Sequence, residues 1–275
     1  MPQLEDYQLR FVSAVEKVIA ANWLQKRPNI RVLDMGCDCT GRQLAEISRL
    51  IRGEAVGINI PSDFPSPHAI EAAGSRVQLI RMDGMNLTFP DASFDLVISA
   101  NVIEHVPDPT KLIREAARVL KPNGVCYLET APVWSGPRGH HVMESMIAEN
   151  CPQETNFRDD GSVIPHWSHL TLDRHQLSEL LRQKLQSSTC DYIIRLVYDS
   201  DILNRVSLQT IRDSLATAFP FISISPWNQY HEDEKYRPQD HLDDYNIYGF
   251  HALGRKRPQS LIKWKLCNRL RLLGW

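Results

Sequence analysis

Histidine is concentrated in one stretch of this 275-residue chain. Five of the ten histidines lie between positions 140 and 175, within GHHV (139–142), PHWSHL (165–170) and at position 175. A neutral imidazole within hydrogen-bond reach of a hydroxyl group can remove its proton near pH 7. Adjacent residues of an extended segment point to opposite sides, so at most one of a neighbouring pair faces a bound molecule. The candidates for a general base are His140 and His141 first, and His166 and His169 second.

The same histidines could instead be metal ligands. Imidazole nitrogens and carboxylate oxygens bind divalent ions, and Asp159 and Asp160 lie in the same stretch. Only His166 and His169 have the short spacing that is typical of metal sites. We therefore expect no metal, and a divalent ion is the alternative.

Acidic and amide side chains recur where short apolar runs end. Asp34 closes RVLDM (31–35), Asn59 closes AVGINI (55–60) and Asp83 closes VQLIRMD (77–83). Such runs are typical of buried strands, and the carboxyl ends of parallel strands form the ligand-binding edge of an open sheet. We expect these three side chains to lie at one site.

The elements that would position these residues alternate along the first half of the chain. Helical spacing of apolar residues predicts helices at 4–24, 43–51, 70–74 and 109–121. Strands are predicted at 31–35, 55–60, 77–83, 94–100 and 124–133. Strands separated in this way by helices indicate crossover connections and a parallel sheet.

The pattern changes after Pro132. Residues 134–170 lack periodicity, which favours a long loop or lid. Helices are predicted at 172–185 and 207–219, and two antiparallel strands at 221–225 and 245–256.

Composition narrows the class of protein. The chain has 31 Lys+Arg and 33 Asp+Glu, a formal net charge of −2, so no basic field is available to hold nucleic acid. Mean hydropathy is −0.32, no apolar run approaches the ~20 residues of a membrane-spanning helix, and the N-terminus does not resemble a signal peptide. The six cysteines are scattered without a zinc-site pattern. We expect a soluble, cytoplasmic protein.

Three segments together resemble class I S-adenosylmethionine-dependent methyltransferases, in particular the type 11 group that includes enzymes of the ubiquinone pathway. They are VLDMGCDCTG (32–41), AVGINI (55–60) and RMDGMNLTFPDASFDLVISANVIEHVPDPTKLIREAARVLKPNG (81–124). The resemblance covers residues 28–135. It implies an α/β, Rossmann-like fold: a mostly parallel seven-stranded sheet with helices on both faces and an antiparallel final strand pair. It also implies S-adenosylmethionine as cofactor.

The resemblance gives each strand-end residue a role. Asp34 corresponds to the carboxylate that faces the cofactor's ammonium group, and Asp83 to the one that accepts from the adenine amine. Asn59 stands where the family has an acid for the ribose hydroxyls, and its one amide oxygen can still accept. The implied cofactor-binding residues are Asp34, Gly36, Asp38, Gly41, Asn59, Asp83, Gly84, Met85 and Asn101.

The turn after the first strand and the dipeptide Glu104-His105 can both be compared with the family's motifs. The family pattern D-x-G-x-G-x-G would place glycines where this chain has Asp38 and Thr40. Either these residues fill the turn, or one residue has been inserted and Gly41 is the family's last glycine. Glu104-His105 matches the family's EH dipeptide, to which we assign a role in shaping the site rather than that of the base.

The acceptor is expected beyond the fifth strand. The segments GHHV and IPHWSHL are similar to those of methyltransferases that modify bacterial surface glycans, and Trp134 and Trp167 suit either stacking on a sugar or anchoring of the loop. We expect O-methylation of a sugar hydroxyl on a glycan or glycolipid. The alternatives are a small-molecule or quinone-type acceptor, and a methyltransferase-like binding protein that has lost catalysis, for which Asp38 and Asn59 argue.

We expect one domain over residues 1–275. It comprises a cofactor-binding half (28–135), an acceptor loop or lid (132–170), helices and the last strands (171–256), and a basic amphipathic tail (257–275). Such a tail suits peripheral contact with the inner face of an anionic membrane. Packing against the domain or against a second subunit of a dimer is the alternative, which apolar stripes more often indicate.

Overall fold

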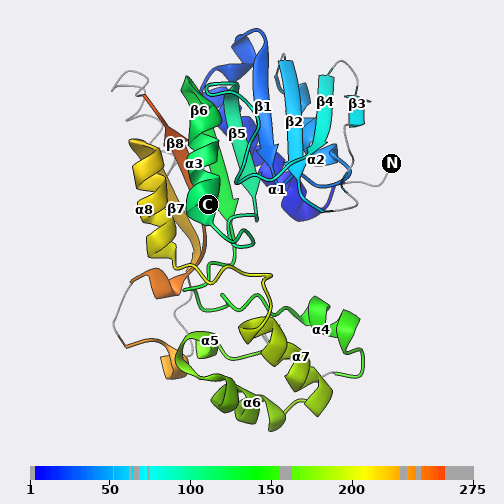
Figure 1. Cartoon of the computed structure of the whole chain (residues 1–275), viewed down its shortest axis with the longest axis vertical. Coiled ribbons are helices and arrows are strands. Elements are labelled where there is room, and N and C mark those ends of the chain that lie inside the picture. Colours follow the sequence, from blue (N-terminus) through cyan, green and yellow to red (C-terminus); the bar gives the residue numbers. More distant parts are fainter. Residues whose placement is uncertain are drawn as a thin grey trace.

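An eight-stranded sheet forms the centre of the molecule, with the strand order β3-β4-β2-β1-β5-β6-β8-β7 (Figure 1). The computed structural model describes residues 4–51, 53–61, 64, 68–72, 75–154, 163–229, 234–239 and 243–257. The strands are β1 (Ile30–Met35), β2 (Gly53–Asn59), β3 (His68–Ala72), β4 (Ser75–Arg81), β5 (Phe94–Ala100), β6 (Leu120–Thr130), β7 (Phe221–Gln229) and β8 (Ile247–Arg255).

Strands β4, β2, β1, β5 and β6 are parallel, and β6-β8-β7 are antiparallel. This confirms the predicted Rossmann-like sheet with an antiparallel final pair. The eighth strand was not predicted: β3 pairs antiparallel with β4 at the edge of the sheet. The predicted helix at 70–74 is therefore wrong. A helix of so few residues is costly to nucleate, whereas an edge strand pairs the exposed backbone groups of β4.

Helices cover both faces of the sheet. Because successive residues of a strand face opposite sides, Val32 of β1 packs in the core under α1 (Asp6–Ala21) and α2 (Arg42–Arg49). Leu33 packs in the core under α3 (Pro109–Val119) and α8 (Leu208–Ala218). These four helices match the predicted ones within a few residues at each end.

A helical unit lies beyond the end of the sheet at which β6 terminates (Figure 1). It contains α4 (Glu144–Asn150), α5 (Ser168–Thr171), α6 (Arg174–Arg182) and α7 (Ser187–Tyr198). It has its own apolar core, in which Ile147, Leu177 and Ile193 are completely buried. The segment predicted as a loop or lid thus contains two short helices, and α7 was not predicted.

Part of the predicted tail, from residue 258 onward, lies outside the described residues, as do Asp159 and Asp160. Within the residues listed above, no helix has the length and hydropathy required to cross a bilayer.

Candidate cofactor and acceptor site

The turn after β1 is built around Gly36. Its φ is +89°, and a Cβ atom placed there would lie 2.1 Å from Cγ2 of Val102. The backbone amides of Gly36 and Cys37 both donate to the carbonyl of Ile58, at 2.8 and 3.0 Å. Glycine is therefore required by the backbone conformation and by the close approach of the segment after β5.

Asp38 and Thr40 replace the family's glycines by forming a hydrogen-bonded turn. The carboxylate Oδ1 of Asp38 accepts from the Thr40 amide at 2.8 Å and from the Thr40 hydroxyl. Neither residue has a positive φ, whereas Gly41, the N-cap of α2, has φ +63°. Within this turn, glycine is thus present at the two positions where φ is positive.

Two carboxylates lie together at this turn. Asp34 is 4% exposed, and burial raises the pKa of its carboxyl to about 7, with a further rise from Asp38 and a partial offset from a hydrogen bond with the Cys37 thiol. Oδ2 of Asp38 is buried and meets no hydrogen-bond donor among the residues that the structure describes. A cationic ligand at this point would satisfy both side chains.

Asn59 ties the end of β2 to the same turn. Its Nδ2 donates to the carbonyl of Cys37 at 3.0 Å, and its Oδ1 accepts from the amide of Ile60 at 2.8 Å. One lone pair of Oδ1 is thus already used, and the second has the geometry to accept from a ligand hydroxyl.

Asp83 caps the turn after β4. Its two carboxylate oxygens accept from the Met85 amide at 2.8 Å and from Nδ2 of Asn86 at 3.0 Å. Gly84 allows close packing, since a Cβ there would lie 2.7 Å from Cδ1 of Leu112. Asp83 therefore has a structural role, and its assignment to adenine stays a prediction.

Asn101 directly follows β5. It has φ +52°, and its amide donates to the carbonyl of Glu129 at 3.0 Å. The predicted cofactor residues thus all lie at or just after the carboxyl ends of β1, β2, β4 and β5, which share one edge of the sheet.

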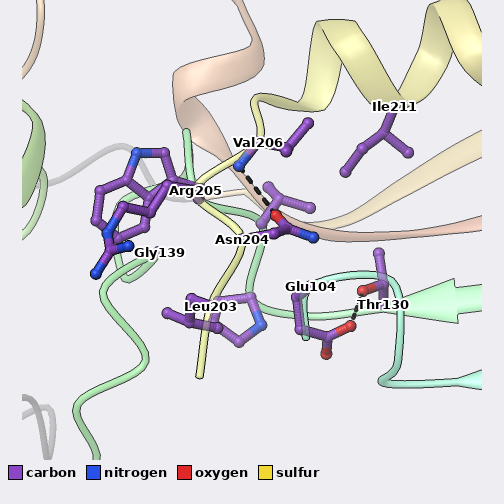
Figure 2. A pocket seen from close by; sticks show the side chains of 11 residues that line it. Glu104, Thr130, Gly139, Leu203, Asn204, Arg205, Val206 and Ile211 are labelled. Atoms are coloured by element: carbon purple, nitrogen blue, oxygen red, sulfur yellow. Dashed lines mark hydrogen bonds between the residues drawn. The ribbon is translucent and has the colours of Figure 1, made fainter. Parts of the chain in front are cut away.

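The EH dipeptide joins the sheet to the helical unit. Burial raises the pKa of Glu104 to about 8, partly offset by the hydroxyl of Thr130, which donates to its carboxylate. Glu104 lines a cavity of about 10 Å³ with Asn204, space for about one water molecule (Figure 2). Nδ2 of Asn204 donates to the carbonyls of Ile103 at 2.6 Å and Val106 at 2.9 Å.

The predicted catalytic histidines separate into two groups. His140, His166 and His169 are 2, 4 and 5% exposed. The rings of His140 and His169 lie 5.2 Å apart, and Nε2 of His169 donates to the carbonyl of Trp134 at 2.8 Å. Burial lowers the pKa of His169 to about 4 and also lowers that of His140. These residues belong to the interior of the helical unit.

His141 points elsewhere. It is half-buried, has φ +54°, and its ring lies 5.2 Å from that of His105. Burial, with His105 and Arg138 nearby, lowers its pKa to about 4, so it is neutral at pH 7. The two tryptophans also differ: Trp167 is buried and its indole donates to the carbonyl of Tyr245 at 2.7 Å, whereas Trp134 is half-buried.

In the described part of the chain, no three His, Cys, Asp or Glu side chains are grouped so that they could hold a metal ion. The sequence analysis missed one cluster, Tyr127 and Glu129 of β6 with His251 of β8. His251 is 124 positions from Tyr127, and the antiparallel pairing of β6 with β8 brings the two strands' residues together.

Part of the sheet half of the chain is similar to known methyltransferases. Residues 33–128 match the family model described as a methyltransferase domain. An uncharacterized methyltransferase of Mycobacterium sp. (strain JLS) is 41% identical over 86 residues, 31% of this chain and 34% of the relative. One from Mycobacterium tuberculosis (strain ATCC 25177 / H37Ra) is 43% identical over 84 residues, 29% of this chain and 33% of the relative. The chain thus spans about a third of the length of these curated relatives.

Among solved structures, the YcgJ protein of Bacillus subtilis aligns with 16% identity and a TM-score of 0.48, over 90% of this chain and 99% of that one. The PH0226 protein of Pyrococcus horikoshii OT3 aligns with 17% identity and a TM-score of 0.48, over 93% of each chain. The sequence match begins within β1 and ends within β6, and it includes all the predicted cofactor residues. Residues 33–128 are thus similar to a methyltransferase domain.

Proposed function

We propose that this protein is an S-adenosylmethionine-dependent methyltransferase that modifies a hydroxyl group, with a sugar hydroxyl of a glycan or glycolipid as the favoured acceptor. The observation that carries the donor assignment is the carboxylate pair after β1. Asp34 has a raised pKa, and Asp38 has a buried oxygen without a donor. The ammonium group of the cofactor would supply the missing positive charge and donors. The methyltransferase match over residues 33–128 supports the same donor.

The residues around this pair fit the rest of the cofactor. Gly36 lets the backbone turn tightly beside it, Asn59 offers its remaining lone pair to a ribose hydroxyl, and Asp83 follows the next strand at the adenine end. The bound cofactor supplies a methyl group activated by a sulfonium. The contribution of the chain is to orient this group toward the acceptor and to exclude water.

The acceptor assignment rests on the helical unit beside the carboxyl edge. Of the four histidines predicted as bases, His141 alone is not buried, so an acceptor can reach it most readily. Trp134 is half-buried in the segment leading to it and could stack on a sugar ring. A quinone-type or other small acceptor is the second candidate, and a binding protein without catalysis the third. A screen of acceptors with labelled methyl donor separates the three.

Calorimetric titration with S-adenosylmethionine tests the donor. We expect binding at pH 7 to release a fraction of a proton, because the cation lowers the pKa of Asp34 from about 7. Titration in buffers of different ionisation enthalpy measures this release. Asp38→Asn should weaken binding about 10- to 100-fold, the equivalent of losing one hydrogen bond to a charged group.

Asp191→Asn is the matched control, since this carboxylate lies on α7 with 60% of its side chain exposed and should not affect the cofactor. An undetectable affinity of the wild type would contradict the proposed function. Equal affinities of wild type and Asp38→Asn would remove Asp38 from the site.

A further inference from the structure

A second group of titratable side chains lies on the same face of the sheet as Asp34. Asp34 of β1 is paired with Ile98 of β5. Two residues nearer the carboxyl edge, Ala100 is paired with Glu129 of β6, and Glu129 with His251 of β8. Residues opposite each other on neighbouring strands share a face, as do residues two apart on one strand. Asp34, Glu129 and His251 therefore face the same side.

Glu129 orients the imidazole of His251. Its Oε2 lies 3.2 Å from Nδ1 of His251, and the two side chains are 15 and 19% exposed. The hydroxyl of Tyr127 donates to the same Oε2 at 3.2 Å and lies 3.0 Å from the same Nδ1. A carboxylate at Nδ1 favours the tautomer with the proton on that nitrogen, so that Nε2 is the basic atom of the ring.

Tyr127 acts as a donor in this group. Burial raises the pKa of its phenol, and the carboxylate of Glu129 raises it further, so the hydroxyl keeps its proton. The ionisable groups that β6 presents to His251 are therefore one neutral phenol and one carboxylate.

Aromatic rings hold the imidazole on both sides. Because β8 lies between β6 and β7, Tyr127 and Trp227 approach His251 from opposite sides. The Tyr127 ring is stacked at 6.0 Å and 13°, and the Trp227 ring at 5.5 Å and 21°. Trp227 is itself fixed, with Tyr248 edge-on at 5.8 Å and Gly249 beneath, where a Cβ would lie 2.9 Å from the indole. A histidine so constrained is preorganised for proton transfer.

We propose that His251 takes up the proton of the acceptor hydroxyl and that Glu129 positions it, an inference that rests on the proposed methyl transfer. β1 and β6 are two strand spacings apart, about 10 Å, a separation that the amino-acid part of the cofactor could span. The acceptor would lie next to it, before His251.

The step balances without a further reactant. The acceptor oxygen forms a bond to the methyl carbon, the carbon–sulfur bond breaks, and its electron pair stays on sulfur. The hydroxyl proton passes to Nε2 of His251, and the carboxylate of Glu129 stabilises the imidazolium. His251 then returns the proton to solvent.

NMR titration of the His251 imidazole in the full chain tests the inference without an acceptor. The resonance is assigned by its loss in His251→Gln and followed with saturating S-adenosylmethionine or with the product S-adenosylhomocysteine, which lacks the sulfonium charge. A base separated from the sulfonium by a hydroxyl oxygen and a methyl group lies about 7 Å from the charge. We expect the titration midpoint to be about 0.4 to 0.9 pH unit lower with the sulfonium than with the product.

Glu129→Gln should lower the same midpoint with either ligand, since it removes the charge that favours the imidazolium. This readout separates a positioning residue from one that only packs. His175, with 79% of its side chain exposed on α6, is the internal control and should titrate identically with both ligands.

Equal midpoints of His251 with the two ligands, or a midpoint unchanged by Glu129→Gln, would overturn the inference. If calorimetry shows that the wild type does not bind S-adenosylmethionine, the proposed function itself fails. The two failures are therefore distinguishable.

Discussion

Acid should destabilise the helical unit through its buried histidines, and His169→Gln should reduce that effect. His169 has a pKa of about 4 in the folded chain because burial disfavours its charged form, against about 6.5 when unfolded. Between these values the unfolded chain binds the additional proton, so stability falls as pH falls. Glutamine can still donate to the Trp134 carbonyl but does not titrate.

The magnitude follows from the two pKa values. Between pH 7.5 and pH 5, protonation of the unfolded state costs the wild type about 2 kcal/mol through His169 alone, and about 3.4 kcal/mol once pH is below both values. Glu104 and Asp34 act in the opposite direction, because their folded-state pKa values of about 8 and about 7 are raised. The difference between wild type and variant cancels these common contributions.

Urea unfolding followed by circular dichroism at pH 7.5, 6.5, 5.5 and 5.0 measures the effect. The free energy of unfolding should fall by about 2 kcal/mol less in His169→Gln than in the wild type over this range. His175→Gln is the control, because this exposed side chain should leave the pH dependence unchanged. Parallel curves for wild type and His169→Gln would refute the reasoning, since they would mean that His169 is hydrated when folded.

Three further outcomes are expected. Gly36→Ala should destabilise the chain by about 1–3 kcal/mol and weaken S-adenosylmethionine binding, because its Cβ would meet Val102 at 2.1 Å; a binding isotherm unchanged from wild type would contradict this. Glu104→Gln should remove a loss of stability that the wild type shows as pH rises from 4.5 to about 8, since the folded-state pKa of Glu104 is raised from 4.5 to about 8; urea midpoints at about pH 5.5 and about pH 8.5 measure this loss. The basic tail predicts salt-sensitive sedimentation with phosphatidylglycerol vesicles that a chain ending at residue 257 lacks. Unfolding on truncation, or dissociation of a dimer, would assign the tail to packing instead.

The parallel half of the fold could be predicted because its signals are local. β1 is a short apolar run that ends in Asp34, and α3 begins with a cap, in which the carboxylate of Asp108 accepts from the Lys111 amide at 2.9 Å before Pro109 opens the helix. β3 could not be predicted, since its stability comes from pairing with β4 rather than from its own residues.

The candidate site also contains residues that local sequence signals predict and residues that only long-range packing brings together. Asp34 and Asp38 could be found because a turn brings neighbours in sequence together. That His140 is buried and His141 is not could not be predicted, because it depends on the packing of the helical unit, in which the His140 ring contacts the His169 ring. The contacts of His251 with Tyr127 and Trp227 depend on the register of β8 with β6 and with β7. No single segment of the sequence encodes that register.

The hydrogen bond between Ser135 and Leu208 joins the two points at which the chain enters and leaves the helical unit. The hydroxyl of Ser135, just after β6, accepts from the amide of Leu208, the first residue of α8, at 3.0 Å. The whole helical unit is therefore an excursion that leaves and re-enters the sheet half at one point, like a domain inserted into a host. Its length and contents can change while the strands keep their register, so the surface of this unit can vary without disturbing the turns after β1 and β2. The residues that match the methyltransferase family model, 33–128, precede this unit and lie in the sheet half.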